Sequence, residues 1–204
     1  MNAFEEGLVR YLNGDQLKKI QSLKIGIGDA GGLGSNVAVI LTRSGFKHFE
    51  IVDQDVIDAS NLNRQQYFAD EIGAVKVETL KKRLLQINPE VEVLVHHVKW
   101  TPETGTAYFH SCPFIIEAFD QAQWKFQFVQ YYQNKTKWII SGNGMARLLE
   151  KKPMNLRKVG NVYIVGDHST DSTQGHPPMA PRVTACAAMM AEVVLDLALG
   201  IKIN

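Results

Sequence analysis

The chain contains little cysteine. Only Cys112 and Cys186 occur, and no pair of cysteines has the two-residue spacing of a zinc-binding or redox motif. Neither a disulfide framework nor a four-cysteine zinc site can be built from these residues, so we expect no structural zinc. Cys112 precedes Pro113 at the start of a strand-like run, and Cys186 lies in an alanine-rich segment. Both positions favour a small apolar filler over a nucleophile.

Charge of one sign and long apolar runs are also scarce. The formal net charge of the 204 residues is +1, which gives no electrostatic footprint for nucleic acid. No secretory leader and no apolar stretch of about 18 residues is present, so we expect a cytoplasmic protein without a membrane partner. The length and the ordinary apolar fraction predict one domain over residues 1–204.

A glycine-rich turn is the most informative feature that is present. Residues 23–28 are typical of a buried strand, and Val37, Ile40 and Leu41 recur at helical spacing after Asp29-Ala30-Gly31-Gly32-Leu33-Gly34-Ser35. Backbone N–H groups of such a turn can face a phosphate. Gly26, Gly28 and Gly31 also satisfy G-x-G-x-x-G, but they would shorten the strand, so we prefer the Gly31/Gly34 register. That register places Asp29 where a first glycine is usual.

An acidic strand end and a polar segment follow the turn. Residues 49–53 predict a second strand that ends in Asp53, about 19 residues past Gly34, where a carboxylate accepts hydrogen bonds from ribose. The segment Ser60-Asn61-Leu62-Asn63-Arg64-Gln65 then supplies amide and cationic groups that a dehydrogenase does not need there. This segment favours activation by ATP over hydride transfer.

Strands and helices alternate along the rest of the chain. The sequence predicts helices over 76–87, 101–110, 123–133 and 183–199, strands over 91–95, 114–118, 138–140 and 162–165, and long loops over 142–161 and 166–181. This alternation is typical of the α/β class, with a Rossmann-like, mostly parallel sheet and helices on both faces. Ligands of such sheets bind beyond the carboxyl ends of the strands, where the glycine turn, Asp53 and Asp120 are expected to converge.

These residues resemble a known family. The turn at 30–35, Asp53-x-Asp55, the segment 60–65, Lys76 and Ala118-Phe119-Asp120 are similar to successive motifs of the ThiF/MoeB/HesA family, the bacterial relatives of ubiquitin-activating enzymes. The likeness runs from about residue 15 to the C-terminus. Met179-Ala180-Pro181-Arg182-Val183 resembles the short, zinc-free ThiF proteins in particular.

The resemblance implies an adenylyltransferase. Such an enzyme uses ATP and Mg²⁺ to adenylate the C-terminal Gly-Gly carboxylate of a ThiS-like sulfur carrier protein in thiamine biosynthesis, releases pyrophosphate, and forms a homodimer. By motif, Asp53 would hold the ribose, Arg64 and Lys76 would act on the phosphates together with Asn61, and Asp120 would bind magnesium. The remaining implied nucleotide contacts are Gly31, Gly32, Gly34, Asp55 and Gln65.

Several positions allow another interpretation. Arg64 could cap a surface carboxylate, and Asp120 could be the N-cap of the following helix. Lys76 near a helix start opposes the helix dipole, which favours a ligand role over a solvated one. A carboxylate at Asp29 about 5 Å from a phosphate would cost on the order of 3 kcal/mol unless it turns away or magnesium bridges it. We therefore keep two alternatives open: a catalytically silent family member that still binds a ubiquitin-like partner, and an NAD(P)-dependent oxidoreductase.

Overall fold

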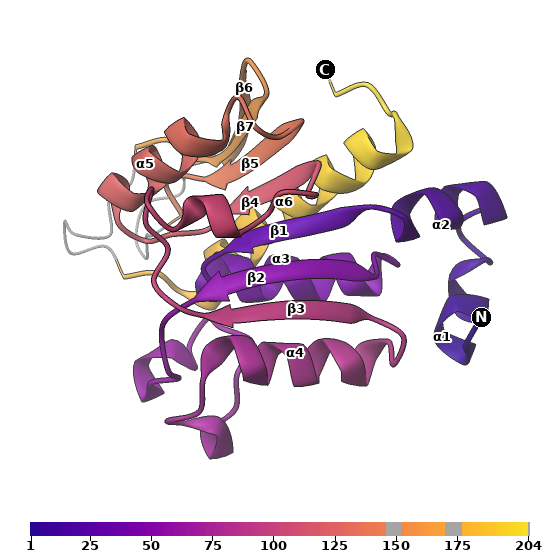
Figure 1. Ribbon diagram of the computed structural model, residues 1–204, viewed down its shortest axis with the longest axis horizontal. Coiled ribbons are helices and arrows are strands. Elements are labelled where there is room, and N and C mark those ends of the chain that lie inside the picture. The colour runs from indigo at the N-terminus through magenta and orange to yellow at the C-terminus, as the bar shows by residue number, and fades with distance from the viewer. Residues whose placement is uncertain (146–151, 170–176, 204) are drawn as a thin grey trace.

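The protein is built on one seven-stranded sheet. The computed structural model describes residues 1–145, 152–169 and 177–203 (Figure 1). The strands are β1 Lys24–Gly28, β2 His48–Asp53, β3 Glu92–His97, β4 Phe114–Glu117, β5 Trp138–Gly142, β6 Asn155–Val159 and β7 Val162–Gly166. Their order across the sheet is β3-β2-β1-β4-β5-β7-β6. All neighbours are parallel except β6, which runs antiparallel to β7.

Strand β1 lies at the point where the strand order reverses. The chain runs outward from β1 through β2 to β3 and then returns to place β4 on the other side of β1. Gly28 at the end of β1 pairs with Val52 of β2 and with Glu117 of β4, so these three strands end at the same level. Open α/β sheets bind ligands in the crevice at such a reversal.

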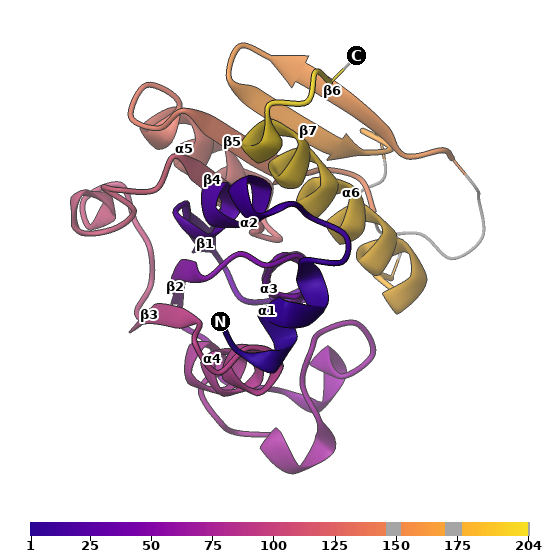
Figure 2. The ribbon, with the colours of Figure 1, turned by 90° about the vertical axis from the view of Figure 1, so that its right-hand side faces the viewer.

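Helices cover both faces of the sheet, as expected (Figure 2). The α-helices are α1 Ala3–Leu8, α2 Gly14–Gln21, α3 Gly32–Arg43, α4 Lys76–Ile87, α5 Ala122–Tyr132 and α6 Ala180–Leu199, and the 3₁₀ turns are η1 Ala59–Asn61, η2 Ala69–Glu71 and η3 Gly105–Ala107. A large aliphatic core packs α3, α4 and α6 on one face. A smaller core, rich in aromatic rings, packs α5 on the other face. None of the helices formed by the described residues has the length and apolar character needed to cross a membrane.

The glycines confirm the register that the sequence favours. Strand β1 runs to Gly28 and α3 begins at Gly32, so Gly31 and Gly34 belong to the turn and the first helical turn. Gly26 and Gly28 lie within the strand, where a Cβ atom would come within 2.7 Å of the rings of Phe109 and Phe128. These two glycines therefore leave room for the aromatic core.

Two local expectations are wrong. The helix expected over 101–110 is replaced by turns and the short η3, and the backbone is extended at Tyr108 and left-handed at Phe109, with φ of 63°. The loop expected over 142–161 contains strand β6, which forms a hairpin with β7. The last helix begins at Ala180, three residues before the expected start, and ends as expected at Gly200, whose φ is 81°. Residues 146–151 and 170–176 of the two expected loops lie outside the described residues.

The close packing at Gly34 predicts how a substitution there affects stability. A Cβ atom on Gly34 would overlap the carbonyl oxygen of Asp29, which is backbone and cannot move aside. We expect Gly34→Ala to cost about 2 kcal/mol or more, which corresponds to a Tm lowered by roughly 4 to 8 °C for a chain of this length. In α1, a Cβ on Gly7 meets no described atom within 4 Å, so Gly7→Ala is the matched control and should leave the Tm unchanged or slightly raised. Equal Tm values for both variants in thermal unfolding would contradict the overlap.

Candidate functional site

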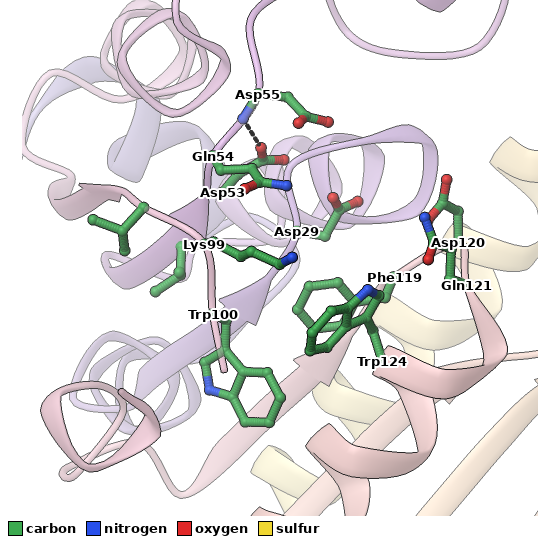
Figure 3. Close-up of a pocket in the computed structure, with 12 residues that line it drawn as sticks. Asp29, Asp53, Gln54, Asp55, Lys99, Trp100, Phe119, Asp120, Gln121 and Trp124 are labelled. Carbon is green, nitrogen blue, oxygen red and sulfur yellow. Dashed lines mark hydrogen bonds between the residues drawn. The ribbon is translucent and has the colours of Figure 1, made fainter. Parts of the chain in front are cut away.

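A pocket of about 150 Å³ lies at the carboxyl edge of the sheet, beside β1 and β4 (Figure 3). Its walls come from the ends of four neighbouring strands and from the first turn of α5. The lining residues are Asp29, Val52, Asp53, Gln54, Asp55, Val98, Lys99, Trp100, Phe119, Asp120, Gln121 and Trp124. Asp53 and Asp120, two strand-end carboxylates expected in one cleft, thus lie in the same pocket.

Asp53 fastens the end of β2 to the glycine turn. Its Oδ2 accepts the Ala30 N–H at 2.7 Å, and its Oδ1 accepts the Asp55 N–H at 2.6 Å. The Asp29 N–H donates to the Val52 carbonyl at 2.9 Å, which adds a second tie between the two strand ends. Only 5% of Asp53 is exposed. The carboxylate therefore has a fixed orientation at the rim where a ribose could donate to it.

Asp29 projects into the pocket and does not turn away from it (Figure 3). Its backbone is left-handed, with φ of 80°, and its Oδ2 accepts the Gly31 N–H at 3.0 Å. The side chain thus occupies one of the amide donors that a phosphate would otherwise use. Burial, together with the nearby charge of Asp53, holds the pKa of the Asp29 carboxyl well above its usual range.

Lys76 balances part of this negative charge. It is the first residue of α4 and is 5% exposed, and its Nζ pairs with Asp55 Oδ2 at 2.9 Å. Burial alone would lower the pKa of Lys76, but the charge of Asp53 and the hydrogen bond to Asp55 raise the pKa above its usual value. The lysine therefore stays charged close to three carboxylates, which explains why it tolerates the unfavourable end of the helix dipole.

Buried polar side chains of α3 hold the Arg64 segment against the glycine turn. Asn36 Nδ2 donates to the carbonyls of Gly32 at 2.6 Å and Arg64 at 2.9 Å, and its Oδ1 accepts Gln66 Nε2 at 2.8 Å. Ser35 Oγ accepts the Gln66 N–H at 3.2 Å. Sequence reasoning missed this function of Asn36. An amide within the apolar face of a helix, here 1% exposed, is the signal that could have indicated it.

Three residues of that segment lie beside the turn but do not line the pocket. Arg64 Nη1 donates to the Ser60 carbonyl at 3.0 Å and to Asn63 Oδ1 at 2.8 Å, so the guanidinium binds its own segment and pairs with no carboxylate of the described residues. Asn61 Oδ1 accepts the Asp58 N–H at 3.1 Å. Gln65 Oε1 is buried without a hydrogen-bond partner among the described residues. An acceptor left unpaired in this way is available to a bound ligand.

Asp120 is exposed and projects from the segment after β4 (Figure 3). The N-cap of α5 is Gln121, which makes no side-chain capping bond, so the alternative interpretation of Asp120 as the N-cap is wrong.

Three other carboxylates form a cluster: oxygens of Asp29, Asp53 and Asp55 lie within 4.8 Å of one another. Oxygen donors of this kind suit Mg²⁺.

The aromatic wall of the pocket was not expected from the sequence. Trp100 and Phe119 line it with ring centroids 6.1 Å apart, and Lys99 Nζ lies 4.6 Å above the ring of Trp124. These residues come together through the loops after β3 and β4, which are far apart along the chain.

Neither cysteine is available as a nucleophile. Cys112 and Cys186 are both free and buried. Burial raises the pKa of each thiol to about 12, so both stay protonated near neutral pH. This agrees with the expectation that they are apolar fillers.

The chain matches a known protein family and several known proteins. A model described as the ThiF family matches residues 7–203. The chain is 26% identical to the adenylyltransferase and sulfurtransferase UBA4 of Candida glabrata, over 93% of this chain and 45% of that protein. It is 31% identical to the tRNA threonylcarbamoyladenosine dehydratase of Bacillus subtilis, over 72% of this chain and 59% of that protein. The chain thus spans about half the length of these curated relatives.

A solved structure supports the same fold. The E. coli tRNA N6-threonylcarbamoyladenosine dehydratase TcdA, crystallised in complex with ATP, superposes with a TM-score of 0.80 and 23% identity. The superposition covers 96% of this chain and 91% of that one.

The raised pKa of Asp29 predicts how stability depends on pH. A carboxyl whose folded pKa exceeds its unfolded pKa contributes stability that is present at low pH and lost as the pH rises through the folded value. Asp29→Asn keeps the hydrogen-bond acceptor and a residue that tolerates left-handed backbone, but it cannot ionise. We expect its Tm to equal that of the wild type near pH 4 and to exceed it by at least about 2 °C at pH 8. Melts in EDTA from pH 4 to 8 measure this, and a constant difference would contradict it.

Proposed function

We propose, from the premise that the chain belongs to the ThiF family, that it binds ATP in this pocket and adenylates a carboxylate with release of pyrophosphate. The observation that carries the proposal is the position of Lys76 and the Arg64 segment. Both are held beside the glycine turn and Asp53, next to a pocket with an aromatic wall. A nucleotide site for hydride transfer has no use for these cations.

The chemistry needs alignment and charge neutralisation more than it needs a base. An acceptor carboxylate oxygen forms a bond to the α-phosphorus while the bridging α–β P–O bond breaks, and pyrophosphate leaves with that bond's electrons. No proton moves, because the attacking carboxylate is already ionised. The two buried thiols, with pKa values raised to about 12, agree with a site that uses no nucleophile of its own.

Six of the predicted residues would act through their side chains in this reaction. Asp53 would accept hydrogen bonds from the ribose, and Lys76 and Arg64 would neutralise phosphate charge. The side-chain amides of Asn61 and Gln65 would donate hydrogen bonds to the nucleotide. Arg64 would have to leave the Ser60 carbonyl to reach a phosphate. Asp120 would hold Mg²⁺, which supplies charge stabilisation at the phosphates.

The acceptor that we propose is the C-terminal Gly-Gly carboxylate of a ThiS-like sulfur carrier of thiamine biosynthesis. The similarity of the motifs to short, zinc-free ThiF proteins supports it. A second candidate is the threonyl carboxylate of threonylcarbamoyladenosine in tRNA. The 31% identity to the Bacillus subtilis dehydratase and the 91% coverage of TcdA favour that candidate. The net charge of +1 argues against it.

One experiment separates these acceptors and the alternatives. Purified protein is incubated with Mg²⁺ and ATP, and with a Gly-Gly-ended carrier, with tRNA carrying threonylcarbamoyladenosine, or with neither. Pyrophosphate release that depends on the carrier supports the proposal, and release that depends on tRNA supports the second candidate. Carrier binding without release identifies a silent family member. A protein that binds NAD(P) and not ATP overturns the proposal.

We expect Arg64→Ala and Lys76→Ala each to lower ATP–pyrophosphate exchange by at least about tenfold, because contacts to transition-state charge are typically worth a few kcal/mol. Lys82→Ala, an exposed lysine of the same helix α4, is the matched control and should keep wild-type exchange. Thermal unfolding verifies that each variant is folded. Wild-type exchange in both test variants would remove the two residues from the reaction.

Asp29 leads to a separate prediction about affinity. Its carboxylate competes with a phosphate for the Gly31 N–H and repels it, at a cost on the order of 3 kcal/mol. Asp29→Gly and Asp29→Asn should therefore tighten ATP binding by up to about a hundredfold and leave adenosine binding nearly unchanged. Calorimetric titrations with Mg²⁺ measure both affinities. If Asp29 instead holds the phosphate through Mg²⁺, ATP binding weakens in both variants and the repulsion argument fails.

A further inference from the structure

The backbone leaves the sheet immediately before Asp120. The last ladder bond between β4 and β1 is the Ala118 N–H donated to the Gly28 carbonyl, at 3.1 Å. The next residue, Phe119, has both of its peptide groups beyond the ladder. Half-buried peptide groups need partners, and here they find them in side chains.

Three side chains from three elements hold the two peptide groups of Phe119, two of them directly and Ser141 through Glu117. Glu117 of β4 accepts the Phe119 N–H on Oε1 at 2.8 Å. Lys125 of α5 donates from Nζ to the Phe119 carbonyl at 2.8 Å and to Glu117 Oε1 at 3.0 Å. Ser141 of β5 donates from Oγ to Glu117 Oε2 at 2.5 Å. The N–H and the carbonyl of one residue are thus both fixed, and we call Glu117, Lys125 and Ser141 the peptide clamp.

Stability alone is a weak reason for such a clamp. The Glu117 side chain is 0% exposed and the Lys125 side chain 18% exposed. Removing two charges from water costs about as much as their attraction returns, so a buried ion pair adds little net stability over apolar side chains of similar size. The contacts of this pair converge on the two peptide groups of Phe119, the residue that leads into the pocket.

The clamped residue connects the core to the pocket wall. The Phe119 ring packs against Phe128, with centroids 5.2 Å apart, and lines the pocket together with Asp120. Asp120 is exposed and follows Phe119 directly, so the orientation of the Phe119 peptide sets where its carboxylate points.

We propose that Glu117, Lys125 and Ser141 are positioning residues that hold the Phe119–Asp120 peptide so that the Asp120 carboxylate meets the magnesium bound with the nucleotide. The positioning role rests on the proposed function, because it requires a bound nucleotide. The existence of the clamp does not depend on that function. Misplacing a ligand by about 1 Å can cost on the order of a hundredfold in rate.

The clamp can be tested without nucleotide. Lys125→Met leaves Glu117 buried without its cation, so the double variant Glu117→Met/Lys125→Met, which removes both charges, keeps the test open if the single variant unfolds. Hydrogen exchange followed by NMR should show the Phe119 amide, which loses its Glu117 acceptor, exchanging at least about tenfold faster in the double variant, with amides of β1 and β2 unchanged. Lys82→Met is the matched control. Wild-type protection of Phe119 in a folded double variant would overturn the clamp.

The positioning role is tested by how much Mg²⁺ strengthens ATP binding. Calorimetric titrations of ATP are run with Mg²⁺ and with EDTA on the wild type, Lys82→Met, Asp120→Ala and the double variant. We expect the clamp variant to lose most of the Mg²⁺-dependent gain, as Asp120→Ala does, while affinity in EDTA changes less than about threefold. A merely structural change would weaken binding equally in both buffers.

The outcomes separate the two proposals. If the Phe119 amide of the double variant exchanges fast but Mg²⁺ strengthens its ATP binding as much as in the wild type, the positioning role is overturned. A wild type that binds no ATP in either buffer overturns the proposed function and the positioning role together, and hydrogen exchange still decides whether the clamp exists. Fast exchange with a lost Mg²⁺-dependent gain supports both.

Discussion

The site depends on the two hydrogen bonds that the Asp53 carboxylate accepts from backbone amides. The Ala30 N–H belongs to the turn after β1, and the Asp55 N–H belongs to the chain leaving β2. One nearly buried side chain thereby joins the glycine turn, the end of β2 and the acidic segment into a single unit. Hydrogen bonds to a charged acceptor are among the stronger ones in proteins, so this unit is rigid where a ligand would contact it.

The same arrangement concentrates negative charge. Asp29, Asp53 and Asp55 lie with oxygens within 4.8 Å of one another, and Lys76 is their buried cationic partner. The net charge of this group is negative even when Asp29 is protonated. Burial, together with the nearby charge of Asp53, raises the pKa of Asp29, so protonation of Asp29 relieves part of that negative charge. A polyanionic ligand therefore requires further cations here. Arg64, Lys99 and a divalent metal are the sources that the surroundings offer.

The sequence was sufficient for the elements whose signals are local. The glycines and the helical spacing after Gly34 predict the turn and α3, and Asp53 is recognisable because it ends an apolar strand. Strand β6 was missed because Asn155–Val159 has no buried face, so only its pairing with β7 makes it a strand. The wall formed by Lys99, Trp100 and Trp124 could not be predicted either, since it exists only once distant loops meet.

Asp29 shows that backbone geometry does not explain every unusual residue. Its φ of 80° requires a residue that tolerates left-handed backbone, and glycine, asparagine and aspartate all do so. The turn would therefore fold with either uncharged residue, and the Gly31 N–H would still find a partner in asparagine or in a bound phosphate. What aspartate alone adds is a carboxyl group that can ionise inside the pocket. Because the fold does not need this ionisable group, its effect is on ligand binding. The ionised carboxylate lowers the affinity for anionic ligands and raises the affinity for ligands that carry a metal ion.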